Sequence, residues 1–514
     1  MKKNQLLACL LVAGLSMSSQ AMAEDVVQLS TSKATGATLT LKFNQLAKGI
    51  SVDWGDGTVQ NYAATTDDYL TVEGEVKGEQ ITISSPSHIK TVICENNGLT
   101  AIDVSGAVYL NSLFCQNNEL TTLDLSQCPK LTDLNCANNN LTSLTVSATN
   151  NPELQNLNIA GNSLKSNLAT GANFSLNCQE LQYLNVSDNV ITTLSLSASN
   201  ANLDVLKCSD NKIKTLNLSN LSNLSVVMCA NNSISAFTTN AENGVPEMRQ
   251  LFAENNKIAK INLALSKNLQ YVSVANNALT ELTLPSKKKL YAISCGNNSL
   301  TFSSLPTTNY KPNNYSYLPQ TEEINVNSKL KKGKDGVYYA VLCPSYNDRN
   351  DETYFIDLTD WAFDSDNLRN TYTFYGKNDS DAEYTLLTKA SNSNKTGDYF
   401  TPTSAMLFGN YSFLQPHDQV YFEITSTHYS DLKFTSTIFR VGEVASTIEG
   451  VTVNDKALQI IPGSGMLQLS GNGQQVGVWS TDGKLLWKGN VGNEGHTISL
   501  PAGVYIVNGK KVAL

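Results

Sequence analysis

The chain has 514 residues and a formal net charge of −9, with 45 acidic against 36 basic side chains. An acidic balance without a basic stripe argues against binding to nucleic acid and to anionic membrane surfaces. Only 16% of the residues are charged, so Asn, Ser and Thr provide most of the polarity, as in β-rich extracellular proteins. The length is sufficient for several domains.

The first 23 residues have the pattern of a secretory signal peptide. Lys2 and Lys3 precede an apolar run over 6–15, and Ala21-Met22-Ala23 comes after it as a cleavage site. The apolar run is too short to span a bilayer, and no later segment approaches about 18 apolar residues. The sequence therefore predicts a protein that is secreted or held at the outer cell surface, with no transmembrane segment.

Residues 24–88 alternate apolar and polar side chains, which predicts a β-rich N-terminal cap over the open end of the repeats that begin at residue 89. The cap contains Trp54-Gly-Asp-Gly-Thr58, in which Asp53 and Asp56 are candidate calcium or ligand groups. We favour the alternative interpretation, a hairpin in which Asp56-Gly57 supplies the turn residues of positive φ. The segment resembles the signature of PKD-type β-sandwich modules, where it is mainly a turn.

Residues 89–305 repeat one unit, L-x-x-L-x-[C/V/I/A]-x-x-N-x-[L/I], about ten times at spacings of 21–27 residues. This is the leucine-rich-repeat signature. The unit predicts a mainly β solenoid of short parallel strands, in which an inward-turning asparagine satisfies backbone groups at the bend. This structural asparagine recurs at Asn97, Asn118, Asn139, Asn162, Asn189, Asn211, Asn232, Asn256, Asn277 and Asn298.

Most of the ten cysteines occur at one position of the same repeat. Six occupy the inward position three residues before the asparagine, namely Cys94, Cys115, Cys136, Cys208, Cys229 and Cys295. Val, Ile or Ala fills this position in the other repeats, so it requires a small apolar body and predicts buried free thiols rather than disulfides. This short repeat with a cysteine ladder resembles the internalin J type of bacterial leucine-rich repeat, whose members are surface adhesins.

Residues 306–445 lose the repeat and gain aromatic, strand-like runs, which predicts an Ig-like β-sandwich against the last repeat. Acidic pairs occur here, but none matches a calcium loop, and we interpret them as solvated loop acids.

Residues 446–514 are rich in glycine and predict a small antiparallel β-sandwich with hairpin turns at Asp482-Gly483 and Asn508-Gly509. This segment resembles the C-terminal sorting domain of the Bacteroidetes type IX (Por) secretion system. The resemblance implies passage across an outer membrane.

No pattern in the sequence indicates catalysis. The four histidines lack metal-ligand spacing, and there is no nucleophile elbow, phosphate-binding loop or dinucleotide fingerprint. Cys343, outside the repeats, is interpreted as a core residue. We therefore predict a protein that is not an enzyme and has neither cofactor nor metal; a hydrolase site within 306–445 is the weakest alternative.

Binding is expected on the outward side chains of the repeat strands, which we call the concave face. Large apolar groups beside amides are typical of a recognition surface, although they can also pack only on each other across strands. The candidate ligand-binding residues are Phe114, Asn135, Asn158, Tyr183, Asn185, Lys207, Met228, Phe252, Glu254 and Tyr271. The favoured hypothesis is a monomeric, adhesin-like protein that binds an extracellular protein or glycoprotein. The alternative is a glycan-binding protein of nutrient capture, centred on the asparagines and tyrosines.

Overall fold

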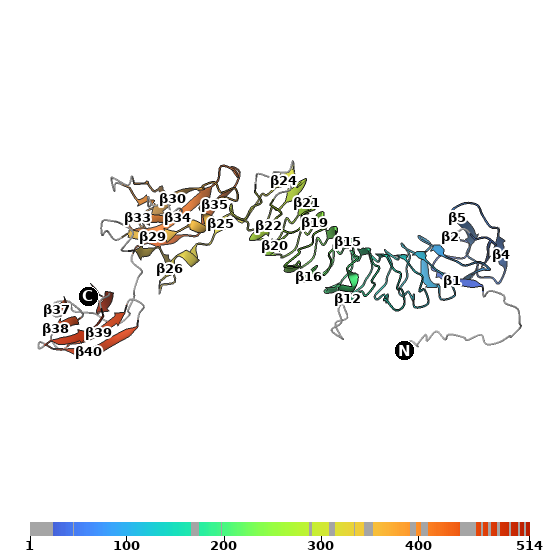
Figure 1. Ribbon diagram of the computed structural model, residues 1–514, viewed down its shortest axis with the longest axis horizontal. Coiled ribbons are helices and arrows are strands. Elements are labelled where there is room, and N and C mark those ends of the chain that lie inside the picture. The colour runs from blue at the N-terminus through green and yellow to red at the C-terminus, as the bar shows by residue number, and fades with distance from the viewer. Residues whose placement is uncertain are drawn as a thin grey trace.

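The protein is an elongated chain of strands, with the repeats between a cap at one end and two further β regions at the other (Figure 1). The computed structural model describes residues 24–513, with gaps at 45, 166–173, 197, 287–289, 308–313, 334, 344–352, 391–396, 402–409, 443–458, 464–465, 471–473, 481–483, 493–494, 502–503 and 508–509. The expected signal peptide and the turns at Asp482-Gly483 and Asn508-Gly509 lie outside the described residues.

A 13-stranded sheet forms the spine of the molecule. Its repeat strands pair in parallel and are three residues long, and the chain bends after each of them, at a structural asparagine in every case but the last. These strands are β7 (Thr91–Ile93), β9 (Ser112–Phe114), β10 (Asp133–Asn135), β11 (Asn156–Asn158), β13 (Tyr183–Asn185), β15 (Val205–Lys207), β17 (Val226–Met228), β19 (Gln250–Phe252), β21 (Tyr271–Ser273), β23 (Ala292–Ser294) and β24 (Asn314–Ser316). The predicted leucine-rich-repeat solenoid is confirmed.

The core lies behind this sheet. The middle residue of each strand from β7 to β23 is buried, as Leu113, Leu184 and Leu251 illustrate, and the cysteine position two residues later is buried with it. All eight cysteines of the repeats are buried and free, which confirms the prediction of unpaired thiols. The side chain of Cys343 lies outside the described part of the structure.

The return path on the opposite side is extended. Parts of it form two-stranded parallel pairs, between β12 (Phe174–Ser175) and β14 (Leu194–Ser195), β16 (Thr215–Asn217) and β18 (Ala236–Thr238), and β20 (Lys260–Asn262) and β22 (Glu281–Thr283). Short 3-10 turns at Ala198–Asn200, Asn327–Lys329 and Thr359–Trp361 are the helical elements assigned. Within the described residues, no helix is long and apolar enough to cross a membrane.

The N-terminal cap closes the solenoid by continuing both of its faces. β2 (Thr38–Asn44) pairs antiparallel with β7 and β5 (Tyr69–Glu75). A second sheet has the order β4-β3-β6-β1-β8. Its strands are β1 (Asp25–Thr31), β3 (Ile50–Asp53), β4 (Val59–Tyr62), β6 (Ile81–Ser85) and β8 (Leu99–Asp103), the last of which is the return path of the first repeat.

The Trp-Gly-Asp-Gly-Thr segment is the turn between β3 and β4. Asp53 accepts hydrogen bonds from the Gly55 and Gly57 amides at 2.8 and 3.0 Å. The Thr58 amide and the Lys77 ammonium, the latter 3.0 Å away, lower the pKa of Asp56. Gly55 and Gly57 have positive φ, whereas Asp56 does not. The prediction of positive φ at Asp56 and Gly57 is therefore confirmed for Gly57 and wrong for Asp56. The carboxylates of Asp53 and Asp56 therefore stabilise the turn itself.

The repeat sheet extends one strand past residue 305, where the repeats were expected to end. β24 pairs in parallel with β23, and Gln320 then occupies the place of the structural asparagine. Its Oε1 accepts from the Leu300 amide at 3.0 Å and its Nε2 donates to the Cys295 carbonyl at 2.9 Å. The longer side chain of Gln320 thus bonds to an amide and a carbonyl, as the structural asparagines do. The solenoid therefore continues for one turn beyond the last repeat of the sequence pattern.

The region expected to be an Ig-like sandwich contains two sheets. One has the order β25-β35-β34-β36-β27-β26, in which β30 also pairs with β34 and β31 pairs with β30, and the other has the order β28-β29-β33-β32. Aromatic rings such as Phe374 and Phe413, whose centroids are 5.4 Å apart, fill the space between them. The strands are β25 (Glu323–Ile324), β26 (Lys331–Lys332), β27 (Tyr338–Tyr339), β28 (Val341–Cys343), β29 (Thr353–Asp357), β30 (Thr371–Lys377), β31 (Thr385–Leu386), β32 (Tyr399–Phe400), β33 (Asn410–Phe413), β34 (His417–Thr425), β35 (Lys433–Ser436) and β36 (Phe439–Val441). The immunoglobulin-like class of this sandwich stays a prediction.

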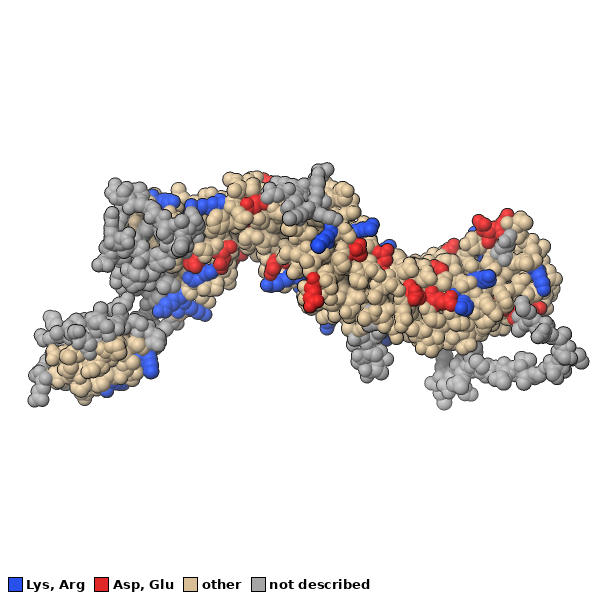
Figure 2. Space-filling model, in the orientation of Figure 1, with Lys and Arg blue, Asp and Glu red and all other residues tan. Residues whose placement is uncertain are grey.

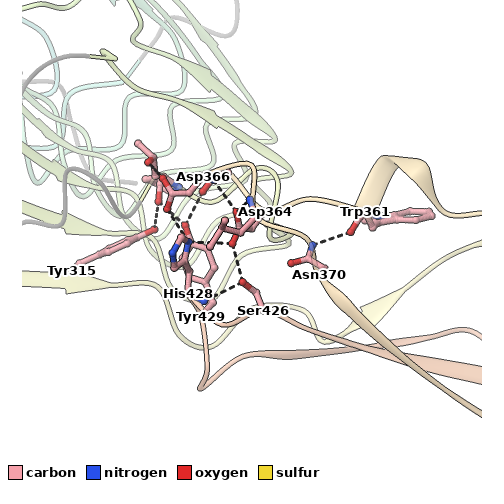
Figure 3. A network of polar contacts seen from close by, with 12 residues as sticks. Tyr315, Trp361, Asp364, Asp366, Asn370, Ser426, His428 and Tyr429 are labelled. Atoms are coloured by element: carbon pink, nitrogen blue, oxygen red, sulfur yellow. Dashed lines mark hydrogen bonds and ion pairs between the residues drawn. The ribbon is translucent and has the colours of Figure 1, made fainter. Parts of the chain in front are cut away.

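A polar and aromatic junction joins this region to the end of the solenoid (Figure 3). Phe302 packs edge-on against Phe434 at 4.8 Å, and the Tyr429 hydroxyl donates to the Pro306 carbonyl at 2.9 Å. Beside them, His428 Nδ1 lies 3.2 Å from a carboxylate oxygen of both Asp364 and Asp366. The junction covers the core that the last repeat would otherwise expose.

The C-terminal segment has a core of its own. Sheets of order β37-β38-β41 and β40-β39-β42-β43 bury Leu467, Val478 and Tyr505, which belong to a cluster separate from the main core. The strands are β37 (Gln459–Gly463), β38 (Met466–Ser470), β39 (Gln474–Ser480), β40 (Leu485–Val491), β41 (His496–Ser499), β42 (Val504–Val507) and β43 (Lys510–Ala513).

Candidate binding surface on the repeat sheet

The asparagine at each bend fixes the geometry of the concave face. Asn118 shows the pattern: its Oδ1 accepts from the Asn97 and Leu99 amides at 3.0 and 2.9 Å, and its Nδ2 donates to the Cys94 and Cys115 carbonyls at 3.0 Å. Each later asparagine repeats the bonds to two successive turns, and Asn97 bonds to Thr40 of β2 instead. All these amides point inward, so they hold the strands in register and are not available to a ligand.

A second row of residues lies beside this ladder and was missed in the sequence. The residue before each structural asparagine has a φ between +52 and +65°, a region that Asn, Asp and Gly tolerate best. Several of these exposed side chains bond to the next, as Asn138 Nδ2 does to Asn117 Oδ1 at 2.8 Å. The signal was present as the recurring Asn-Asn and Asp-Asn doublets.

The candidate ligand-binding residues fall into columns across the sheet, because the parallel register places equivalent positions side by side. One column contains Phe114, Asn135, Asn158, Asn185, Lys207, Met228 and Phe252, and the next contains Tyr183 and Tyr271. Phe114, Met228 and Phe252 are half-buried, while Tyr271 is 37% exposed. Glu254 lies two residues after Phe252, half-buried, at the edge of the same face.

The three asparagines in the middle of this face have part of their hydrogen-bonding capacity occupied. Oδ1 of Asn135, Asn158 and Asn185 accepts from the backbone amide two residues later, at 3.1–3.3 Å. Their Nδ2 groups have no partner among the described residues and remain available as donors. Next to them, the Lys207 ammonium lies 5.4 Å from the centre of the Tyr183 ring.

The C-terminal end of the face is hollowed. A hollow of about 530 Å³ opens over β21, β23 and β24, with Phe252 and Tyr271 among its lining residues. Tyr291, which the sequence analysis did not single out, stacks on Tyr271 at 5.6 Å and is 60% exposed. Tyr291 immediately precedes β23 and so is not one of the alternating outward positions from which the candidate residues come.

The electrostatic character of the surface is weak. Figure 2 shows scattered acidic and basic side chains along the solenoid, with most of the visible surface neither acidic nor basic. Within the described residues, no three His, Cys, Asp or Glu side chains gather as they would to hold a metal ion. Burial raises the pKa of the Cys115, Cys208 and Cys295 thiols to about 12, so these thiols are unreactive at neutral pH.

The fold and its repeat define a leucine-rich-repeat solenoid. No family model matches the chain, and no curated protein is similar to it in sequence. Among solved structures, the functional domain of InlJ from Listeria monocytogenes, which includes a cysteine ladder, is 19% identical, over 70% of this chain and 93% of that one, with a TM-score of 0.27. YopM from Yersinia enterocolitica is 25% identical, over 42% and 47%, with a TM-score of 0.31. An internalin (InlF) from Listeria monocytogenes is 18% identical, over 43% and 80%, with a TM-score of 0.30.

Proposed function

We propose that this chain is a non-enzymatic, extracellular binding protein of the adhesin type that recognises a protein or glycoprotein through the concave face. The observation that carries the proposal is the contrast across each repeat strand. The inward residue is buried in the core, whereas its two neighbours face outward, and three of these outward side chains, Phe114, Met228 and Phe252, are large and apolar.

These outward groups have the composition of a protein-binding surface. Interfaces are enriched in aromatic residues, Met and Arg and depleted in charge at their centre, and a few aromatic anchors carry most of the binding energy. A rigid β-sheet also holds such anchors with little loss of conformational entropy on binding. Truncating one anchor typically weakens binding by more than about 1 kcal/mol.

The test is binding of the purified chain to mucins, extracellular-matrix proteins and polysaccharides, in parallel with a Phe114→Ala/Met228→Ala/Phe252→Ala variant. We expect the variant to lose at least tenfold in affinity for the ligand found. A matched variant truncates three exposed apolar residues outside the strand columns, Val108→Ala, Val190→Ala and Leu265→Ala. Equal loss in both variants, or loss in neither, would contradict recognition by the concave face.

A glycan ligand is the second candidate, and a specific observation favours it. The free Nδ2 donors of Asn135, Asn158 and Asn185 form a row that can bond to hydroxyl groups, with Tyr183 beside it. In that case, polysaccharides rather than deglycosylated proteins should bind, and Asn158→Ala should weaken binding more than Phe114→Ala.

We also propose that the chain reaches the outer surface by means of the leader at 1–23 and the sorting-like segment at 446–514. The separate core of the C-terminal segment supports this role, because a tail that packs on itself can be recognised or removed without opening the solenoid. Deleting 446–514 in the producing cell should leave the protein inside the envelope. Unchanged exposure to added protease would contradict the proposal.

A further inference from the structure

The hollow at the C-terminal end of the concave face is an open depression lined by side chains of the last repeat strands. It measures about 530 Å³, within the range of small-ligand sites. Phe252 bounds it on the side of the earlier repeats, and Tyr271 rises from the adjacent column. Tyr291 extends this aromatic wall, because its ring stacks on that of Tyr271 at an interplanar angle of 22°.

The floor of the hollow is lower than the rest of the face because the side chains of one column become smaller from one strand to the next. Phe252 pairs in register with Ser273, and the next two strands hold Ser294 and Ser316 at the same position. Ala292 and Asn314 continue the floor in the neighbouring column. The last of these strands, β24, lies beyond the sequence repeat, so the complete cavity was not visible in the repeat pattern.

The polar groups of this floor are not used by the protein. The hydroxyls of Ser273, Ser294 and Ser316 and the amide of Asn314 make no side-chain hydrogen bond within the described residues. The asparagines in the middle of the face differ, because their carbonyl oxygens are bonded to their own backbone. The hollow therefore offers both donors and acceptors to an occupant.

Among the described residues, no charged side chain lines the hollow. A charged occupant would lose its hydration without gaining a counter-charge, which disfavours acidic and basic ligands. An apolar occupant would leave the hydroxyls of the floor without water or partner, which is unfavourable for each group. The occupant that fits is neutral, has many hydroxyl groups and has one apolar face that can lie on a tyrosine ring.

We propose that this hollow is a carbohydrate subsite that takes one neutral sugar unit of a larger glycan. The proposal rests on the proposed function, since it names the ligand class for one part of the same concave face. The serines and Asn314 bond to the sugar hydroxyls, while Tyr271 and Tyr291 contact the carbon-bound hydrogens of the sugar ring. Phe252 closes the end of the site.

The test fills the hollow without disturbing the fold. Ser294→Phe places in the floor a side chain that the same column already holds at Phe114 and Phe252. Ser112→Phe makes the same change at an outward position of β9, near the other end of the sheet and outside the candidate binding residues, and is the matched control. The full chain and both variants are measured by biolayer interferometry against mannan, laminarin and dextran as neutral probes, and against heparin and a deglycosylated mucin. Thermal melting checks that all three proteins fold.

We expect at least one neutral polysaccharide to bind, with at least tenfold loss in Ser294→Phe and less than twofold change in Ser112→Phe. Equal binding by parent and Ser294→Phe would overturn the subsite. Binding only to heparin would overturn the ligand class. Binding only to deglycosylated mucin, lost in the Phe114/Met228/Phe252 variant, would overturn the subsite and leave the proposed function standing, whereas no binding to any probe would overturn both.

Discussion

The inward and outward side chains of one repeat strand share a backbone but are subject to different constraints. In β15, Leu206 is fully buried between neighbouring strands, whereas Val205 and Lys207 on either side of it are half-exposed. From β7 to β23, the middle residue of each repeat strand and the residue two positions later are Leu, Val, Ile, Ala or Cys, while the outward column changes from Phe114 to serines. Stability therefore lies on one side of the sheet and the proposed recognition on the other, and the two can vary independently.

High pH should weaken the inward side most strongly. Burial raises the pKa of Cys115, Cys208 and Cys295 to about 12 and that of Cys128 and Cys178 to about 11. A thiol in the unfolded chain ionises near about pH 8.5. The buried thiols therefore contribute their full stabilisation below that pH. Above it, the unfolded chain ionises while the folded chain does not, so each thiol lowers the unfolding free energy by up to about 1.4 kcal/mol per pH unit as the pH rises toward 11–12. Urea unfolding in reducing buffer at pH 8 and pH 10 measures this loss.

The control replaces the thiols by the residue that the same position holds elsewhere. In a Cys115→Val/Cys208→Val/Cys229→Val variant, which copies Val186 and Val274, the dependence on pH should become shallower. An equally steep loss would attribute the alkaline sensitivity to other groups.

Truncation of adjacent residues in β15 should separate the two sides directly. Leu206→Ala creates a cavity in the core and should cost about 2–5 kcal/mol of unfolding free energy. Lys207→Ala, at the next position, should cost no more than about 0.5 kcal/mol. Chemical denaturation of both variants measures the difference. Similar costs would mean that the outward side chains also carry stability.

Two asparagines of one repeat allow a matched comparison of ladder and face. Asn139→Ala leaves the Leu120 amide without its side-chain partner and removes one of the two amide donors from each of the Cys115 and Cys136 carbonyls, at a cost of about 1–3 kcal/mol. Asn135→Ala removes one bond to the Ala137 amide and should cost less than about 1 kcal/mol. If the order were reversed in thermal melting, the inward amide would not be the structural one.

The smallest effect is expected in the row of positive φ. Asn231 has a φ of +56°, so Asn231→Ala should destabilise by about 1 kcal/mol. Asn231→Gly keeps the backbone conformation and should be nearer to the parent in stability, although it loses the side-chain bonds to Asp210 and from Asn255. Equal effects of the two substitutions would show that these bonds, and not the backbone, are what the residue contributes.

The sequence predicted the solenoid because a periodic apolar pattern and an inward amide leave few other ways to bury the same residues. It also predicted free thiols, since Val, Ile and Ala occupy the cysteine position in other repeats. The eleventh strand escaped notice because Gln320 performs the role of asparagine with a longer side chain. The hollow escaped for a related reason: its walls and floor combine three columns and that extra strand, and no single repeat contains the shape.

The concave residues illustrate a further limit of pattern reading. Alternation located Asn135, Asn158 and Asn185 on the outward side, but it did not reveal that their carbonyl oxygens bond to the backbone two residues on. Half of each amide is therefore structural. Such local bonds depend on side-chain rotamers, which a sequence does not specify.

The ladder of asparagines has a consequence for how such a chain can change its length. Each turn gives and receives the same bonds, so a duplicated unit of 21 residues meets on both sides the partners that its parent met. Only the two ends are unique, with Thr40 at one and Gln320 at the other. Whole units can thus be gained or lost by recombination while both closures stay intact, and each added unit brings a new set of outward side chains at about 4.8 Å from the last.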